Sequence, residues 1–117
     1  MNSSRLHYSP EAAQDLENIR DYVMLEFSNP EAALRIVDQI MNAADNLVSF
    51  PKLGATLASI TGIASPYRFI VAGKYMVFYR VEGEDVYIDR ILYGKRDYFR
   101  VLFEDQEENL WSDSQRT

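Results

Sequence analysis

Residues 67–92 read YRFIVAGKYMVFYRVEGEDVYIDRIL, and this stretch decides the fold. Three of its segments, Tyr67–Val71, Tyr75–Val81 and Val86–Leu92, are rich in β-branched and aromatic residues, as strands usually are. A Gly-Lys pair separates the first two segments, and Glu-Gly-Glu-Asp separates the last two. Both connections have the length and composition of hairpin turns, so the stretch predicts a three-stranded antiparallel meander.

Two helices are predicted ahead of the meander by the same start signal. SPEAA begins at Ser9 and NPEAA at Asn29, and each offers an N-cap side chain, a proline at the first helical position and an acid in the first turn. Because Pro30 prevents the first helix from continuing, the pair should form a hairpin that turns near residues 28–29. Apolar residues recur with the spacing of an amphipathic helix at Ala12, Leu16, Ile19, Val23 and Phe27, and again at Ala33, Ile36, Val37, Ile40, Ala44 and Leu47.

The order of these elements indicates the fold class. A short N-terminal strand at Arg5–Tyr8 precedes the helices, and the meander follows them. This order is typical of an α+β fold in which an antiparallel two-helix hairpin packs on one face of a mainly antiparallel sheet of about four strands. Proline and glycine predict a loop over residues 50–65. We expect one domain over residues 1–103 and an acidic tail over residues 104–117.

One face of the predicted sheet has no obvious cover. Alternation along the middle strand places Tyr75, Val77 and Tyr79 on one face and Met76 and Phe78 on the other. A single helix pair covers only one face of a sheet. The face that carries Met76 and Phe78 therefore needs another covering or a partner chain, and we expect these two side chains to be exposed for a partner.

Composition excludes several classes of site. The chain has 117 residues, of which 47% are hydrophobic, with no cysteine and a single histidine, His7. These counts exclude a disulfide scaffold, cysteine-based metal or redox sites and a histidine cluster for zinc, so we expect no metal and no cofactor. No apolar run reaches the roughly 18–20 residues of a membrane span, and the first ten residues carry no secretory signal, so we expect a cytoplasmic protein without membrane contact.

Charge is distributed unevenly along the chain. The net charge is −6, but residues 66–100 hold seven basic and five acidic residues, whereas residues 101–117 hold one basic and five acidic residues. Contact with nucleic acid needs a basic footprint, so the overall charge argues against broad nucleic-acid binding and against direct DNA binding by this chain alone. A small basic patch from residues 66–100 remains compatible with this charge.

The basic residues of the meander are the first candidates for chemistry. Arginine forks hold phosphates and stabilise transferring phosphoryl groups, while tyrosines stack on bases or transfer protons. The alternative is that the arginines pair with nearby acids such as Glu82, Asp85 and Asp89. The candidates are Arg68, Arg80, Arg90, Lys95 and Arg96, with Tyr79, Tyr93 and Tyr98 close to them in sequence.

Two other groups of polar residues are interpreted as surface features. His7 could be a general base, but it has no partner nearby in sequence, so we interpret it as a surface residue. Glu11 with Asp15, and Glu17 with Asp21, lie one turn apart on the first predicted helix. A carboxylate site would need a metal or a reactive sugar beside them, and we interpret both pairs as a solvated helix face.

Taken in order, residues 5–98 resemble the RelE/ParE superfamily of type II toxin–antitoxin toxins. The resemblance begins with the two capped helices and continues through FPKLG at residues 50–54. Its most specific part comprises Arg68, Gly73, Tyr75, Val77, Tyr79, Arg80 and Val81, followed by Val86, Ile88, Arg90, Leu92, Gly94, Arg96 and Asp97.

The resemblance implies a partner and two alternative targets. Toxins of this superfamily are neutralised by a small antitoxin, which commonly lays a helix or strand across apolar and basic parts of the toxin. The RelE-like branch cuts messenger RNA in the ribosomal A site with basic residues that hold the phosphate, and it uses no metal. The ParE-like branch, associated with plasmid stabilisation, poisons DNA gyrase.

Position by position, the sequence is closer to the ParE-like branch. Arg96 falls where RelE-type nucleases have a catalytic arginine, but a second arginine of that branch falls on Met76. Its lysines fall near Tyr67 and Phe69, and its late tyrosine falls on Leu102. Methionine carries neither charge nor an acid–base proton, so it cannot replace a phosphate-binding arginine.

Three functions follow as hypotheses. The first is a toxin that causes growth arrest by binding gyrase. The second is a metal-independent, ribosome-dependent endoribonuclease, and the third is a toxin fold that keeps only antitoxin binding. For the nuclease, the catalytic residues would be Arg96, Lys95 and Arg68, with Tyr93 or Tyr98 as base. Target contacts are expected at Arg80, Arg90, Tyr93 and Tyr98, and antitoxin contacts at Met76 and Phe78.

Overall fold

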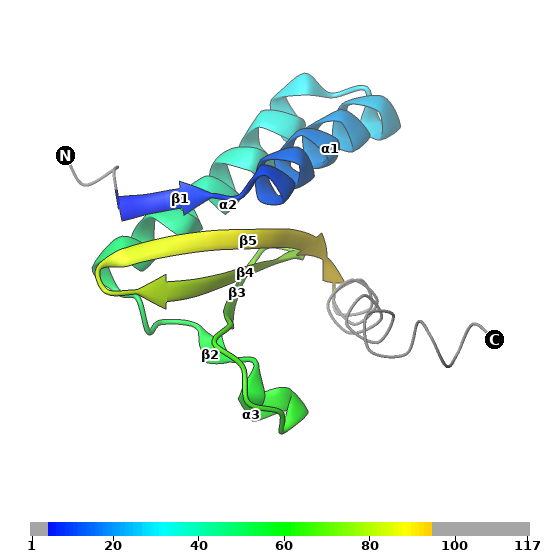
Figure 1. Cartoon of the computed structure of the whole chain (residues 1–117). Coiled ribbons are helices and arrows are strands. Elements are labelled where there is room, and N and C mark those ends of the chain that lie inside the picture. The colour runs from blue at the N-terminus through cyan, green and yellow to red at the C-terminus, as the bar shows by residue number, and fades with distance from the viewer. Residues whose placement is uncertain (1–4, 95–117) are drawn as a thin grey trace.

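The computed structural model describes residues 5–94, and Figure 1 shows how their elements are arranged. Helix α1 and helix α2 follow the first strand as an antiparallel pair, and the remaining strands come after them. In chain order the elements are β1 (Leu6–Tyr8), α1 (Pro10–Phe27), α2 (Pro30–Ser49), β2 (Ala55–Thr56), α3 (Ala58–Thr61), β3 (Arg68–Ala72), β4 (Tyr75–Glu82) and β5 (Asp85–Tyr93).

Both long helices begin where the capping signals predict. The Ser9 hydroxyl accepts a hydrogen bond from the Ala12 amide at 2.9 Å, and the Asn29 side-chain oxygen accepts one from the Ala32 amide at 3.1 Å. Each helix has its proline at the start, and α1 ends at Ser28 with a left-handed backbone of φ 49°. The predicted helical hairpin and its turn are therefore confirmed.

The sheet has five strands in the order β1-β5-β4-β3-β2. Strand β1 pairs parallel to β5, while the other three pairs are antiparallel, which confirms the α+β class and the meander. The fifth strand, β2, lies within the segment 50–65 that was predicted to be a loop. Two residues are enough to form it, because Ala55 pairs with Phe69 and Thr56 with Arg68.

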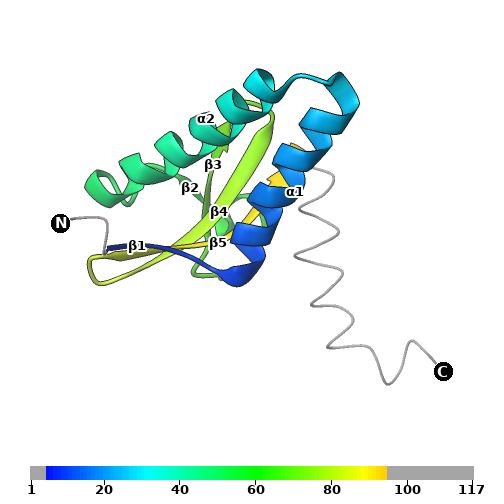
Figure 2. The same ribbon diagram turned by 90° about the horizontal axis from the view of Figure 1, so that it is seen from above.

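The main core lies between the helices and the sheet. Figures 1 and 2 show α1 and α2 side by side over one face of the sheet. The alternation predicted for β4 is confirmed, since Tyr75, Val77 and Tyr79 point into this core and meet Ile40 and Leu47 of α2. These side chains are buried, and their burial supplies the main hydrophobic contribution to stability.

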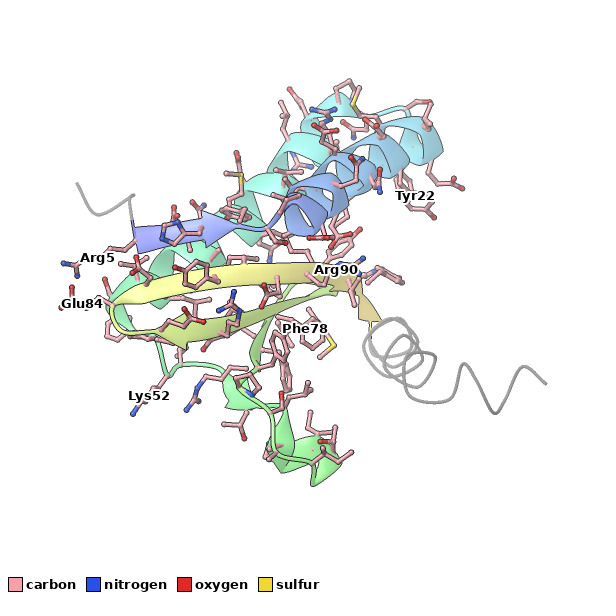
Figure 3. The ribbon with its side chains drawn as sticks, viewed as in Figure 1. Arg5, Tyr22, Lys52, Phe78, Glu84 and Arg90 are labelled. Atoms are coloured by element: carbon pink, nitrogen blue, oxygen red, sulfur yellow. The ribbon has the colours of Figure 1, made fainter. Side chains whose placement is uncertain are left out.

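The opposite face of the sheet is covered by the chain itself, so the expectation that Met76 and Phe78 are exposed is wrong. Met76 is 4% exposed and Phe78 is 0% exposed, and both pack with Leu57 in a second apolar cluster. The cover forms because the Leu57 amide donates to the Tyr67 carbonyl at 2.9 Å, which folds the segment from β2 to α3 back onto the sheet. Figure 3 shows Phe78 on the side of the sheet away from α1 and α2.

Candidate interaction site

Arg68 is engaged in holding a loop. Its guanidinium donates to the Gly54 carbonyl at 2.8 Å. The Tyr79 hydroxyl reaches the same loop, where it donates to the Pro51 carbonyl at 2.7 Å and accepts from the Gly54 amide at 2.9 Å. Burial raises the pKa of the Tyr79 hydroxyl, while the hydrogen bond to Gly54 and the charge of Arg68 act against that rise. Arg68 and Tyr79 therefore fix residues 51–54 to the sheet.

Arg80 is paired with two carboxylates. It contacts the Glu82 carboxylate, and its Nε lies 3.3 Å from Oδ2 of Asp89. Its guanidinium also lies 4.5 Å from the centre of the Tyr87 ring, which is a cation–π distance. Burial raises the pKa of Asp89 despite the opposing attraction of Arg80. The alternative in which the meander arginines pair with neighbouring acids is confirmed for Arg80.

Arg90 joins the sheet to α1. Its Nε and Nη2 donate to the two oxygens of Asp15 at 2.8 and 3.0 Å, and the Ile91 amide donates to the same carboxylate at 2.9 Å. The Asp15 side chain is 12% exposed, so its interpretation as part of a solvated helix face is wrong. Strand β1 pairs only with Val86–Ile88, and Asp15 satisfies an amide of β5 beyond that pairing.

His7 has a partner that is distant in sequence. Its Nε2 lies 3.0 Å from Oδ1 of Asp85, and its ring stacks on Tyr87 with centroids 4.7 Å apart. Both His7 and Asp85 are about two-fifths exposed, so this pair lies at the surface on strands β1 and β5.

The remaining candidates are Tyr93, at the end of β5, and three residues that follow it in sequence. Tyr93 is 52% exposed and meets Tyr75 edge to face at a centroid distance of 5.4 Å. Burial raises the pKa of Tyr75, and Tyr93 and Tyr22 add to that rise. Lys95, Arg96 and Tyr98 lie outside the described residues 5–94, as does the predicted boundary at residue 103.

An apolar groove lies between the helices and the far end of the sheet. It encloses about 770 Å³. One wall is formed by α1, the other by the end of β5, and α2 and the β3–β4 turn contribute the rest. Its lining includes Asp15, Tyr22, Phe27, Lys74, Ile91 and Tyr93.

The apolar stripe on α1 was predicted to pack into the core, but part of it lines this groove. The stripe on α1 that includes Ile19, Val23 and Phe27 has helical spacing, and such a stripe usually packs inward. In the structure Val23 is buried, whereas Phe27 is 65% exposed at the mouth of the groove. Which end of the stripe is covered depends on tertiary packing, which local sequence does not indicate.

Two classes of site find no support within residues 5–94. In that part of the chain no three His, Asp or Glu side chains gather as metal ligands would. None of its helices is both long and apolar enough to cross a membrane.

Comparison with known proteins gives a consistent result. A family model described as ParE toxin of type II toxin-antitoxin system, parDE, matches residues 6–98. Toxin ParE1 from two strains of Mycobacterium tuberculosis is 31% identical over 101 residues, which cover 86% of this chain and 99% of the relative. A solved chain titled Chromosomal ParDE TA system from P. aeruginosa superposes with a TM-score of 0.65 at 26% identity, and covers 77% of this chain and 95% of that chain.

Proposed function

Because the chain belongs to the ParE family of toxins from type II toxin–antitoxin systems, we propose that it arrests growth by binding DNA gyrase, and that its cognate antitoxin prevents this. Gyrase acts on chromosomal and plasmid DNA in the cytoplasm, so we place the toxin there. In this proposal the toxin acts by occupying a protein target and performs no covalent chemistry of its own.

The observation that carries the proposal is the internal pairing of the sheet arginines. Arg68 donates to a backbone carbonyl, Arg80 pairs with Glu82 and Asp89, and Arg90 pairs with Asp15. A nuclease needs cations that can hold a phosphate and stabilise the charge that develops during cleavage. Binding to a protein target imposes no such requirement.

The position of Met76 supports the same choice. The resemblance aligns this residue with an arginine of the RelE-like nucleases, and in the structure Met76 is buried among Leu57, Phe78 and Leu92. A buried, uncharged side chain cannot hold a phosphate. Position 76, which the resemblance aligns with a nuclease arginine, and Arg68, which the nuclease hypothesis makes a phosphate contact, are therefore both engaged in structural contacts.

Target contacts are proposed for the region where β5 ends. Tyr93 is half exposed there, and Lys95, Arg96 and Tyr98 follow it in sequence. The proposed target contacts do not include Arg80 and Arg90, because both are paired within the chain. The proposed antitoxin contacts do not include Met76 and Phe78, because both are buried.

The proposal is tested by expressing the chain alone in a bacterium and following growth, plasmid topology and transcript ends. Growth arrest with relaxed plasmid and intact messenger RNA is the expected result. Transcripts cut at ribosomal positions, with normal plasmid topology, would instead establish the nuclease. Normal growth with stable accumulation of the chain would contradict the proposal and favour the hypothesis of a toxin fold that has lost its toxicity.

One substitution tests the proposed target contacts. We expect Arg96→Ala to abolish growth arrest without changing the thermal midpoint, because it removes a cation from the proposed contact region and is not expected to disturb the core. Arg35→Ala on the exposed face of α2 is the matched control and should remain toxic. Equal toxicity of the two variants would remove Arg96 from the target surface.

A further inference from the structure

Helix α2 carries a second stripe of side chains, apart from the one that packs into the core. The buried residues of this helix are Ala33, Ile40, Ala44 and Leu47. The outer stripe recurs every three or four residues, every member of it is exposed, and it consists of Glu31, Leu34, Asp38, Met41 and Asp45. Residues at this spacing lie on one face of a helix. At about 1.5 Å per residue, the stripe is about 21 Å long.

Two apolar side chains of the outer stripe are open to solvent. Leu34 is 58% exposed and Met41 is 40% exposed, and the seven positions between them place them two turns apart on the same face. Figure 2 shows α1 and α2 as the layer nearest the viewer, with the sheet behind them. Apolar side chains at positions i and i+7 are the spacing with which one face of a helix binds a complementary surface. The outer stripe is therefore a helix face without a partner in the described part of the chain.

The charges of the outer stripe are all negative. Glu31, Asp38 and Asp45 alternate with the two apolar residues, and none of the three forms an ion pair within residues 5–94. Residues 10–49, which include both long helices, hold eight acidic and two basic residues, a net charge of −6. The rest of the chain holds ten acidic and ten basic residues and is neutral. The net charge of the protein thus lies on the helical hairpin.

This charge selects the chemistry of the partner. A stripe that alternates acidic and apolar residues is complementary to a protein surface that alternates basic and apolar residues, because each carboxylate then faces a cation. Nucleic acid does not fit, since its phosphates repel the carboxylates. A second copy of the chain is disfavoured as well, because its own outer stripe carries the same charges.

We propose that the toxin binds gyrase through the outer stripe, and that the stripe occupies a basic surface of gyrase that otherwise holds the DNA backbone. An enzyme that holds DNA needs cations along the path of the phosphates, so gyrase presents a surface of this kind. The inference rests on the proposed function, because it takes gyrase as the target. It adds a contact on α2, separate from the residues proposed where β5 ends, and it requires toxin and DNA to exclude each other.

The first test reverses one charge of the outer stripe. Affinity of the full-length toxin for purified gyrase is measured by biolayer interferometry. Asp38→Lys should weaken binding by about 30-fold, whereas Asp38→Glu keeps the charge and should bind as the unaltered toxin does. Glu26→Lys is the matched control, because it makes the same change in net charge on α1, one turn after Tyr22 of the groove. It should change affinity by less than about threefold.

The second test removes an apolar contact. Leu34→Ala should weaken binding to gyrase by about tenfold, because less apolar surface is buried in the complex. Leu25 is 82% exposed on α1, outside the outer stripe, so Leu25→Ala should change affinity by less than about twofold. Circular dichroism confirms that each variant is folded. Equal affinities within both pairs, Asp38→Lys with Glu26→Lys and Leu34→Ala with Leu25→Ala, would show that the outer stripe is not the contact.

The third test examines competition with DNA. A fluorescent linear duplex bound to gyrase should be displaced by the unaltered toxin, and displacement by Asp38→Lys should need a concentration about 30-fold higher. A complex in which gyrase holds the toxin and the duplex together, with the affinity of each unchanged, would overturn the proposal. Gyrase would remain the target in that case.

Four further outcomes separate this inference from the proposed function. If the unaltered toxin does not bind gyrase, both are wrong. If Asp38→Lys inhibits supercoiling as the unaltered toxin does, only the inference is wrong. Loss of antitoxin binding by Asp38→Lys, with inhibition unchanged, would assign the outer stripe to the antitoxin instead. A toxin that sediments as a dimer, and as a monomer after Leu34→Ala, would assign the stripe to a second copy and equally overturn the proposal.

Discussion

At the scale of single residues, the contact between Gly54 and Tyr79 shows why a loop glycine is required. A Cβ added at Gly54 would lie 2.5 Å from the Phe69 carbonyl oxygen and 2.7 Å from the Tyr79 hydroxyl. Both atoms are held in place, the first by the sheet and the second by its bond to the Pro51 carbonyl. The glycine is needed for space and not for a left-handed backbone, since it is not among the positive-φ residues.

This geometry predicts the effect of filling that space. Gly54→Ala should lower the free energy of unfolding by about 2 kcal/mol, because the methyl group has to displace backbone or break the Tyr79 hydrogen bonds. Urea denaturation measures the change. Gly62→Asn is the control, because Gly62 has open space around it and asparagine tolerates its left-handed backbone. Equal stability of Gly54→Ala and the unaltered chain would contradict the account of the loop.

Tyr8 presents the opposite case, a buried hydroxyl without a hydrogen-bond partner in the described part of the chain. An unpaired buried polar group destabilises the fold, so Tyr8→Phe should raise the free energy of unfolding by about 1 kcal/mol at pH 7. Urea denaturation at that pH is the measurement, with Tyr87→Phe on β5 as a comparison. A clear loss of stability in Tyr8→Phe would show that the hydroxyl contributes a favourable contact.

The same residue makes a prediction about pH. Burial, followed by the nearby Asp45 carboxylate, raises the pKa of Tyr8 from 10.0 to about 12. The folded state holds this proton more tightly than the unfolded state. Ionisation of Tyr8 therefore leaves the free energy of unfolding unchanged below pH 10 and lowers it as the pH rises from 10 to about 12. The alkaline loss of stability should be smaller in Tyr8→Phe. Identical pH profiles for the two proteins would contradict the assignment.

At the scale of elements, local signals identified most of the fold. Each helix cap, at Ser9 and at Asn29, and each hairpin turn of the meander depends on a few neighbouring residues. These features can therefore be predicted from the sequence alone. Strand β2 and helix α3 were missed because two- and four-residue elements are too short to show a period. They exist because Leu57 packs on Met76 and Phe78, a contact that local patterning does not indicate.

The Asp15–Arg90 pair could not be predicted for a similar reason. The two residues are 75 positions apart, and both were interpreted from their own surroundings, one as a helix surface and the other as a target contact. Only the packing of α1 against β5 brings them together. The pairing also explains why Arg90 is not offered to a ligand as a free cation.

Loss of this pair should weaken the attachment of α1 to the sheet. Asp15→Ala leaves the Arg90 guanidinium and the Ile91 amide without a shared acceptor, so it should lower the free energy of unfolding by about 2–3 kcal/mol. Glu17→Ala, on the exposed face of the same helix, should change it by less than about 0.5 kcal/mol. Hydrogen exchange of the Ile91 amide would report the local effect, and unchanged protection would contradict it.

At the scale of the whole molecule, apolar clusters lie on both faces of the sheet within residues 5–94, and a groove with exposed aromatic side chains lies at one side. The sequence predicted an open sheet face because it indicated only one covering layer, the helical hairpin. The structure has a second cover, in which Leu57 packs on Met76 and Phe78, and the end of the α1 stripe at Phe27 is exposed together with Tyr93. The position predicted for a partner surface, at Met76 and Phe78, is wrong because both side chains are buried, and the existence of such a surface stays a prediction.

The internal pairing of the meander arginines also explains how a toxin of this family can carry a negative net charge. The arginines of the meander serve the fold, and a protein target requires no phosphate-binding surface. A toxin that entered the ribosome would meet a dense array of phosphates, against which a net charge of −6 is unfavourable. Gyrase binding is consistent with this charge when the contact region occupies only a small part of the toxin surface.

The measurement that tests the central claim most directly is a supercoiling assay with purified gyrase and the purified full-length toxin. The account predicts that the toxin inhibits supercoiling in proportion to its concentration, and that adding the cognate antitoxin restores it. Undiminished supercoiling at a toxin concentration that stops growth, together with cleavage of messenger RNA in a translating extract, would contradict the account.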